Sequence, residues 1–244
     1  MIIKNLLRKK IGNLKRQTFD KIITKVNIFN LKRQNVGENT YIDSSVQVLG
    51  WENVRIGSNS IISEDSWINI NHRNSETISL SIGDNCFIGR RNFFTTGGSI
   101  EIGDYCLTAP NCNFLGADHI YSSPFAPYIT SGVSEDGTIE IGANCWLGAN
   151  VTVLKNVKIG YGSIIGAGTL VTKNVPPLSI VVGNPGRVIK RFDLKQQVWI
   201  GIDEYCVDND LDLMSDSEYL AILNETNLDL RGYWIASSKS FGDL

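Results

Sequence analysis

Two residues in this chain have the type needed for proton transfer near neutral pH. Among 244 residues only His72 and His119 are histidines. An imidazole titrates near neutral pH, so it can take a proton from one group and return it to another. A lone histidine in a loop is nevertheless more often an ordinary surface residue, so residue type alone assigns neither of them a role.

A second group of residues could bind an anionic ligand. Thr172, Lys173, Arg187 and Lys190 offer a hydroxyl and three cationic side chains, which pair well with phosphate oxygens. Taken one at a time, such lysines are usually solvated surface charges. Their place in a larger pattern therefore has to decide their role.

The five cysteines do not form a metal or redox motif. The chain has no Cys-x-x-Cys pair, and thiols in a reducing compartment stay free. Four of them occupy the small, inward position of the repeat described below: Cys86, Cys106, Cys112 and Cys145. We predict that these four are packing residues.

Two further patterns resemble ligand sites but lack an essential part. Asp208, Asp210 and Asp212 are spaced as at the start of a calcium loop. Leu213, however, stands where the loop needs glycine, and Tyr219 stands where it needs glutamate. A glycine-rich stretch in the last repeats resembles a dinucleotide-binding turn but lacks the flanking strand and helix. We therefore predict no metal and no dinucleotide site.

A repeat sets the elements that must position these residues. A tetrapeptide of the pattern aliphatic-x-Ile-Gly occurs five times, ending at Gly57, Gly83, Gly103, Gly142 and Gly160. Between these marks run hexads in which an aliphatic residue is often followed by glycine and then by a small or β-branched residue. This period is not helical, and it favours short strands that end in tight corners. Three sides of six residues form a coil of 18, and stacked coils predict a parallel β-helix.

The spacing of the marks predicts two loops. From Ile56 onward the intervals are 26, 20, 39 and 18 residues, against 18 for a regular coil. The two large excesses require loops that leave the coil near residues 71–78 and 117–137. His72 lies in the first of these loops and His119 in the second.

The two ends of the chain differ in charge from each other. Residues 1–34 hold ten Lys or Arg and one Asp, a net charge of +9, which leaves −11 on the rest of a chain whose net charge is −2. With a pI of 5.7, the chain offers no electrostatic case for nucleic-acid binding. Residues 1–35 have apolar residues at helical spacing, which predicts an amphipathic helix. This helix would either cap the open end of the β-helix or contact an anionic membrane surface or polymer.

The remaining organisation follows from the same patterns. Residues 36–192 are the predicted β-helix domain, and residues 193–244 are an acidic extension with a helix near residues 215–223. The chain has no apolar run long enough to span a bilayer and no signal-peptide core. We therefore expect a cytoplasmic location, with the inner face of the cytoplasmic membrane as a variant of it.

Residues 138–192 carry the most specific signal. The sequence Ile-Gly-Ala-Asn-Cys-Trp-Leu-Gly-Ala begins at Ile141, Val-Thr-Lys-Asn-Val-Pro-Pro at Val171, and Gly-Asn-Pro-Gly-Arg at Gly183. This resembles the C-terminal signature of the acetyl-CoA-dependent hexapeptide-repeat acetyltransferases, which include galactoside, streptogramin and capsular polysaccharide acetyltransferases. The resemblance implies a left-handed, triangular β-helix, a handedness that the period does not fix.

The resemblance also implies that acetyl-CoA is the co-substrate. Ala149 and Ala167 correspond to positions whose backbone binds the pantetheine arm, and a backbone amide near Gly148 would stabilise the oxyanion. The hydroxyl and cationic group corresponds to positions that meet the nucleotide phosphates: Thr172, Lys173, Arg187 and Lys190.

On the acceptor side, His119 corresponds to the general base of the family. It would activate a sugar hydroxyl for direct acetyl transfer from sulfur to oxygen, with no covalent enzyme intermediate. Trp146 is expected to face outward, either as a wall of the acceptor or acyl site or as part of a subunit interface. Tyr121, Phe125 and Tyr128 either form the acceptor wall or anchor the loop, and the sequence does not separate these alternatives. His72 is a secondary candidate for contact with the acceptor.

The resemblance finally implies a homotrimer with sites between adjacent prisms. The favoured interpretation is an O-acetyltransferase acting on a bacterial surface polysaccharide, such as capsule or lipopolysaccharide, or on its precursor. N-acetylation of an amino sugar or sugar nucleotide, or acetylation of an antibiotic, stays open because nothing in residues 121–137 decides the acceptor. A silent scaffold is the remaining alternative, although it would need the hexads and not His119, Trp146 or the pair Thr172-Lys173.

Overall fold

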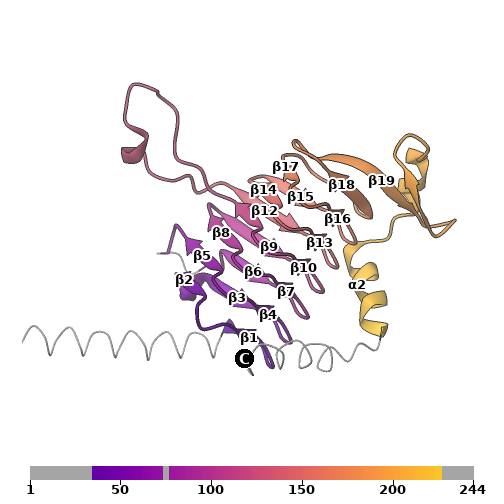
Figure 1. The fold of residues 1–244 in the computed structure, drawn as a ribbon, viewed down its shortest axis with the longest axis horizontal. Helices are drawn as coiled ribbons and strands as arrows, with labels where there is room; N and C mark the ends of the chain where they lie inside the picture. Colours follow the sequence, from indigo (N-terminus) through magenta and orange to yellow (C-terminus); the bar gives the residue numbers. More distant parts are fainter. Residues whose placement is uncertain (1–34, 74–76, 227–244) are drawn as a thin grey trace, which may run out of the picture.

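The chain folds into a triangular stack of parallel coils. A computed structural model describes residues 35–73 and 77–226, and the basic segment predicted to be helical therefore lies outside the described residues (Figure 1). Each coil contributes one strand to each of three sheets, which we call the five-strand, nine-strand and six-strand faces after their strand numbers. The predicted parallel β-helix is confirmed.

The three faces are built from these strands. The five-strand face contains β3 (Val54–Ile56), β6 (Leu80–Ile82), β9 (Ser99–Ile102), β12 (Thr138–Ile141) and β15 (Val157–Ile159). The six-strand face contains β2 (Gln47–Leu49), β5 (Trp67–Ile70), β8 (Phe93–Thr96), β11 (Asn113–Leu115), β14 (Thr152–Leu154) and β17 (Leu170–Val171). The nine-strand face contains β1 (Tyr41–Ile42), β4 (Ile61–Ile62), β7 (Phe87–Ile88), β10 (Leu107–Thr108), β13 (Trp146–Leu147), β16 (Ile164–Ile165), β18 (Ser179–Val182), β19 (Arg187–Asp193) and β20 (Val198–Gly201).

The core is a set of columns in which each repeat position stacks on its counterpart. The isoleucine of each tetrapeptide pairs in register with the next, and all five are at most 3% exposed: Ile56, Ile82, Ile102, Ile141 and Ile159. Phe94 and Phe114 stack in the same way, with ring centroids 4.5 Å apart and planes 3° apart. Burying one apolar side chain against the same side chain of the next coil gives the fold its core.

Four of the five cysteines belong to this interior, as predicted. Cys86, Cys106 and Cys145 are buried, and each thiol donates to a carbonyl of the next coil at 3.2–3.3 Å. Ser60 and Ser163 occupy the same position in the coils before Cys86 and after Cys145, and they donate in the same way. A small donor at this corner therefore satisfies a carbonyl that the tight turn would otherwise leave without a partner.

Three edges join the faces. The edge between the six-strand and five-strand faces is here called the loop edge. It carries residues 71–73, 77–79 and 116–137, at the two places where loops were predicted. The second of these projects far from the stack (Figure 1) and contains the short helix η2 (Tyr128–Thr130). The edge between the nine-strand and six-strand faces, here the Gly148 edge, carries residues 148–151 and 166–169. The third edge carries residues 142–145 and 160–163.

The acidic extension continues the stack and then folds back along it. β19 and β20 add antiparallel to β18, so the predicted boundary at residue 192 falls inside β19. The predicted helix is confirmed as α2 (Asp216–Glu225), which starts with a capping box between Ser215 and Glu218. The ring of Tyr219 stacks on Tyr161 at 4.3 Å, and its hydroxyl accepts from Asn144 at 2.7 Å. The helix therefore lies against the third edge of the prism.

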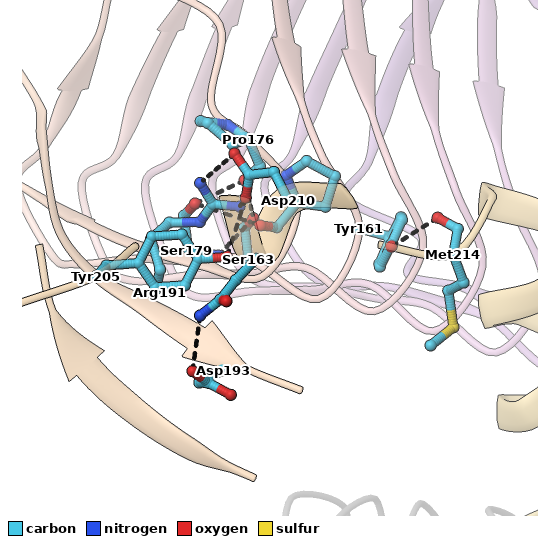
Figure 2. Close-up of polar contacts among 11 residues, drawn as sticks. Tyr161, Ser163, Pro176, Ser179, Arg191, Asp193, Tyr205, Asp210 and Met214 are labelled. Carbon is cyan, nitrogen blue, oxygen red and sulfur yellow. Dashed lines mark hydrogen bonds and ion pairs between the residues drawn. The ribbon is translucent and has the colours of Figure 1, made fainter. Parts of the chain in front are cut away.

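An ion pair made by a buried arginine fixes this extension to the last coil (Figure 2). The Arg191 guanidinium is 2.7 Å from Asp210 and lies over the Tyr205 ring at 4.8 Å. Tyr205 also donates its hydroxyl to Asp210 at 2.9 Å, within the helix η3 (Val207–Asp212) and the segment before it. Burial and this hydrogen bond raise the pKa of Tyr205 to about 12.

Candidate active site

The two arms of the long loop pair with each other where they leave the stack. Ser134 N–H donates to the Asp118 carbonyl at 2.8 Å, and Ile120 N–H donates to the Gly132 carbonyl at 3.1 Å. Gly132 has a φ of +82°, in the left-handed region that glycine adopts without strain. The turn of the chain at this glycine points its carbonyl at the opposite arm.

That carbonyl also contacts the predicted base. The Nδ1 atom of His119 lies 3.1 Å from the Gly132 oxygen, and the side chain is exposed. A carbonyl oxygen only accepts hydrogen bonds, so in the neutral ring Nδ1 holds the proton and Nε2 holds the lone pair. The loop therefore presents His119 with its basic nitrogen free of this contact.

The carboxylate next to this histidine points to the stack. Asp118 pairs with the Lys155 ammonium at 3.1 Å, and Asp136 on the returning arm lies 4.0 Å from the same ammonium. Lys155 follows β14 in the adjoining coil, and its hydrogen bond to Asp118 raises its pKa. One lysine therefore contacts both arms of the loop.

His72 contacts the loop from the opposite direction. Its Nε2 atom lies 3.2 Å from the Ser134 carbonyl, and its Nδ1 atom lies 3.5 Å from the Glu135 carboxylate. Both ring nitrogens thus have partners within the protein. The geometry makes His72 a residue that ties the short loop to the long one, and the contact with an acceptor predicted for it stays a prediction.

The tip of the long loop carries apolar side chains in solvent. Phe125 is 96% exposed, Tyr121 is 69% exposed, and Tyr128 and Ile129 are also exposed. Residues 120–134 contain no Asp, Glu, Lys or Arg. An uncharged segment with this much exposed apolar surface is typical of a contact site.

The residues predicted to bind the pantetheine arm lie together on the Gly148 edge. Gly148 N–H donates to the Ile165 carbonyl at 2.8 Å, so this amide belongs to the coil ladder. A Cβ atom at Gly148 would come within 2.6 Å of the Ala167 nitrogen, which explains the glycine. Within the described residues, the Ala149 and Ala167 amides have no protein acceptor. The amide near Gly148 that could serve an oxyanion is therefore that of Ala149.

The predicted phosphate contacts are all exposed but do not form one cluster. Thr172 and Lys173 follow β17 and lie on the loop edge. Arg187 and Lys190 lie on β19, beside the nine-strand face. Gly186 N–H donates to the Leu170 carbonyl at 2.8 Å, which places the start of β19 near the Gly148 edge. The two pairs therefore approach β17 from opposite ends.

Within one chain the predicted donor and acceptor residues lie on different parts of the prism. His119 is on the loop edge, Ala149 and Ala167 are on the Gly148 edge, and Trp146 is on the nine-strand face between other strands. A single prism therefore does not bring Trp146 beside His119.

Trp146 belongs instead to an apolar stripe that runs the length of the nine-strand face. Seven residues in consecutive register form it: Tyr41, Ile61, Phe87, Leu107, Trp146, Ile164 and Ile180. Trp146 faces outward as predicted, and it is half exposed. The stripe favours the subunit-interface alternative for this residue.

Comparison with known proteins identifies the repeats. Residues 138–173 match the family described as "Bacterial transferase hexapeptide (six repeats)", and residues 79–109 match "Hexapeptide repeat of succinyl-transferase". Among curated proteins, the galactoside O-acetyltransferase of Escherichia coli (strain K12) is 32% identical over 139 residues, which are 54% of this chain and 64% of that protein. The chain therefore carries the hexapeptide repeats of bacterial transferases and is similar to the hexapeptide-repeat acetyltransferases.

Other relatives agree with this assignment. A protein of Staphylococcus aureus (strain COL) named as an acetyltransferase is 41% identical over 114 residues, which are 47% of this chain and 56% of that protein. The chain thus spans about half the length of the first curated relatives it matches. The N-acyltransferase AntD of Bacillus cereus, solved with dTDP and 3-hydroxybutyryl-CoA, has the same fold, with a TM-score of 0.56 at 23% identity over 66% of this chain and 86% of that one. The β-helix is accordingly left-handed.

Between residues 35 and 226, residues 74–76 aside, the structure contains no helix of the length and hydropathy that a membrane span requires. The same part of the chain contains no group of three or more His, Cys, Asp or Glu arranged to hold a metal ion.

Sequence reasoning missed Lys155 and Gly132, since no motif marks either residue.

Proposed function

We propose that this chain is an acetyl-CoA-dependent O-acetyltransferase that acts on a sugar hydroxyl. The observation that carries the proposal is the geometry of His119, whose Nδ1 atom is engaged by the Gly132 carbonyl while the ring is exposed. The neutral ring therefore offers Nε2 to an acceptor from solvent. Galactoside O-acetyltransferase, to which the chain is 32% identical, supports a sugar as the acceptor class.

The chemistry follows from the charge changes during transfer. An alcohol is a poor nucleophile at neutral pH, so Nε2 of His119 takes the hydroxyl proton as the oxygen attacks the thioester carbonyl carbon. A tetrahedral oxyanion forms and is stabilised by a backbone amide such as that of Ala149. The carbon–sulfur bond then breaks, and the imidazolium returns its proton to the departing CoA thiolate. The products are the acetyl ester and CoA, with no covalent enzyme intermediate.

The donor would lie along the Gly148 edge. The amides of Ala149 and Ala167 have no protein acceptor in the described part of the chain and suit the carbonyls of a pantetheine arm. Arg187 and Lys190 on β19 lie nearer this edge, and Thr172 and Lys173 lie past the other end of β17. All four are exposed and suited to the nucleotide phosphates. The AntD structures, which share the fold, were solved with CoA or an acyl-CoA.

A complete site would need two copies of the chain. His119 and Ala149 lie on different edges of one prism, so the base of one copy would meet the donor of its neighbour. The apolar stripe through Trp146 supplies surface for such an assembly. We propose a homotrimer, in which Tyr121 and Phe125 would reach the acceptor beside a neighbouring prism. An active monomer would contradict this arrangement.

The acceptor would be a hydroxyl of a bacterial surface polysaccharide or its precursor. The net charge of +9 on residues 1–34 fits work beside an anionic membrane or polymer, where such precursors are made. Transfer to an amino sugar would use the same donor site. The residues of the acceptor loop would determine whether a hydroxyl or an amine is acetylated. No observation favours a second function strongly enough to replace the first.

Thiol release from acetyl-CoA tests the proposal. Purified protein is assayed with neutral, sialylated and amino-sugar acceptors, and His119→Ala is compared with the unchanged chain. We expect acceptor-dependent release that falls by about 10²- to 10⁴-fold in the variant, the usual contribution of a general base. Acetyl-CoA should still raise the unfolding temperature of His119→Ala, because most of the contacts proposed for the donor lie on the Gly148 edge and not at this residue.

The possible results separate the alternatives. Equal release by both proteins would remove His119 as the base. Release only with amino sugars would establish N-acetylation. If acetyl-CoA neither reacts nor shifts the unfolding temperature of the unchanged protein, the chain is a scaffold with no donor site.

A further inference from the structure

The root of the long loop is held from both sides by single residues of the coil stack. Lys155, from the turn that follows β14, contacts Asp118 on the outgoing arm and Asp136 on the returning arm. His72, from the shorter loop, contacts the Ser134 carbonyl and the Glu135 carboxylate on the returning arm. The returning arm also lies close to the stack at Gly97 and Gly98, where a Cβ would come within 3.1 Å of the Ser134 carbonyl oxygen and 3.0 Å of the Glu135 carbonyl oxygen.

Lys155 is placed by the coil register and is not free to lie elsewhere. Leu154, the residue before it, pairs with Leu115 at the end of β11, so Lys155 lies directly beside the point where the loop leaves the stack. Its Cβ is 3.1 Å from the position a Cβ would take at Gly137, where the loop returns. The side chain is only 22% exposed, although it is a lysine. A long cationic side chain packed over both loop ends is held there by its carboxylate partners.

The contact between Lys155 and Asp118 is one residue away from the proposed base. Asp118 uses its carboxylate for Lys155, its carbonyl for Ser134 N–H and its amide for the Ser134 hydroxyl. These contacts fix the arm on which His119 follows, opposite Val133. The His119 ring then reaches the Gly132 carbonyl across the paired arms. The lysine, the carboxylate, the paired arms and the ring therefore form one connected chain of contacts.

We propose that Lys155 is a positioning residue for His119. By holding Asp118 it keeps the two arms of the loop in the register that brings the Nδ1 atom of His119 to the Gly132 carbonyl, and so keeps Nε2 as the basic nitrogen. The kinetic part of this inference rests on the proposed function, whereas the structural part does not. A shift of about 1 Å in a reacting group can cost about 10²-fold in rate, so a contact outside the site can matter as much as one within it.

The test uses the chain's two histidines. Lys155→Met removes the ammonium and keeps an unbranched apolar side chain, and Lys155→Arg keeps the charge. Lys158→Met is the matched control, because Lys158 lies three residues later and forms an ion pair of nearly the same length, 3.2 Å, with Glu140 away from the loop. Nitrogen-15 NMR of the imidazoles reports the tautomer directly, and a chain with two histidines gives two sets of signals. His72→Ala assigns them.

We expect Lys155→Met to shift the His119 ring from the Nδ1–H tautomer toward a mixture of the two tautomers. Lys155→Arg should keep most of the Nδ1–H signal. Lys158→Met should leave the His119 signals unchanged. In the acetyl-transfer assay, kcat of Lys155→Met should fall by about 10- to 100-fold, with the KM for acetyl-CoA within about twofold. A purely structural role for Lys155 would lower the unfolding temperature without this separation of kcat from KM.

Each outcome decides the inference. Unchanged His119 signals in Lys155→Met would overturn it, whether or not the unchanged chain transfers acetyl. Changed signals in a chain that transfers no acetyl would support the positioning and contradict the proposed function. Should Lys155→Met fail to fold, Asp118→Asn removes the same ion pair without removing the packed side chain, and it must then perturb the same signals.

Discussion

The interior of the coils is held by contacts that repeat from coil to coil, whereas the root of the long loop is held by contacts that occur once. In the interior, every side chain repeats a contact made one coil earlier, as Phe114 does on Phe94, and polar groups such as the Cys106 thiol are satisfied by the next turn. At the loop root, each contact occurs once. Lys155 meets Asp118, His119 meets Gly132, and no neighbouring coil offers a replacement for either.

This difference separates stability from chemistry. A stack of equivalent coils shares its stability among many similar interfaces, and its side chains are hidden from any substrate. The loop adds little buried surface, but it holds a basic nitrogen in one orientation beside solvent. Substitutions in the stack should therefore change the free energy of unfolding, and substitutions at the loop root should change the rate of reaction.

The largest expected effect compares two phenylalanines, one in each region. Phe114→Ala removes a fully buried ring from its stack on Phe94 and should lower the free energy of unfolding by about 3–5 kcal/mol. Phe125→Ala removes a ring that is 96% exposed and should change it by less than about 0.5 kcal/mol. Urea unfolding followed by circular dichroism measures both.

The assay reverses the order of these two variants. Well below its unfolding transition, Phe114→Ala should keep the kcat of the unchanged chain, whereas Phe125→Ala should raise the KM for the sugar acceptor. Similar losses of stability in the two variants would mean that the loop tip is packed against another copy, and that the two regions are not separate.

The next effect in size concerns two glycines with left-handed backbones. Gly132→Ala forces an alanine to a φ of +82°, and Gly168→Ala forces one to +71°, each costing about 1–2 kcal/mol. A Cβ at Gly132 would meet only the end of the Ile120 side chain at 3.9 Å, and one at Gly168 would meet nothing within 4 Å, so strain alone is tested. The losses of stability should be alike.

Only the strain in Gly132→Ala should affect His119. Strain at Gly132 is relieved by turning the peptide whose carbonyl accepts from His119, so the imidazole NMR signals should change in Gly132→Ala and stay unchanged in Gly168→Ala. A changed signal in both variants would show that the loop root responds to the stack as a whole.

The regular region was predictable from the sequence because its rules are local and repeated. The five tetrapeptides mark one face, the intervals between them locate both loops, and Ser215 with Glu218 marks the start of α2. The inward position of Cys86, Cys106, Cys112 and Cys145 follows from the same hexads. Each of these features depends on residues within one coil or one helical turn.

The contacts at the loop root were not predictable for the opposite reason. Lys155 lies 37 residues after Asp118 in the sequence and belongs to no motif. Its role depends on which turn of the next coil lies over the exit of the loop. Gly132 matters only because the arms pair in one register. Trp146 and His119 are separated because one lies on the nine-strand face and the other on the loop edge. The sequence around neither residue shows how far apart these places are.

The smallest expected effect is a loss of stability at alkaline pH that results from the titration of Tyr205. The pKa of Tyr205 is raised to about 12, first by burial and then by the hydrogen bond to Asp210, against 10.0 for a free tyrosine. A group whose pKa is raised in the folded state stabilises the protein fully below its unfolded pKa. That contribution is lost as the pH rises from about 10 to about 12.

Tyr205→Phe removes this dependence. Below pH 10 the variant should be less stable by about 1 kcal/mol, since it loses the hydrogen bond to Asp210. Between pH 10 and 12 the difference should shrink, because only the unchanged chain loses the tyrosine contribution there. Tyr121→Phe is the control from the loop, since its ring is 69% exposed and its removal uncovers no buried group. Urea unfolding from pH 8 to pH 11.5 measures the three proteins. A constant difference across this range would mean that Tyr205 has the same pKa in the folded and unfolded states. Its contact with Asp210 would then stabilise the fold without making the stability depend on pH.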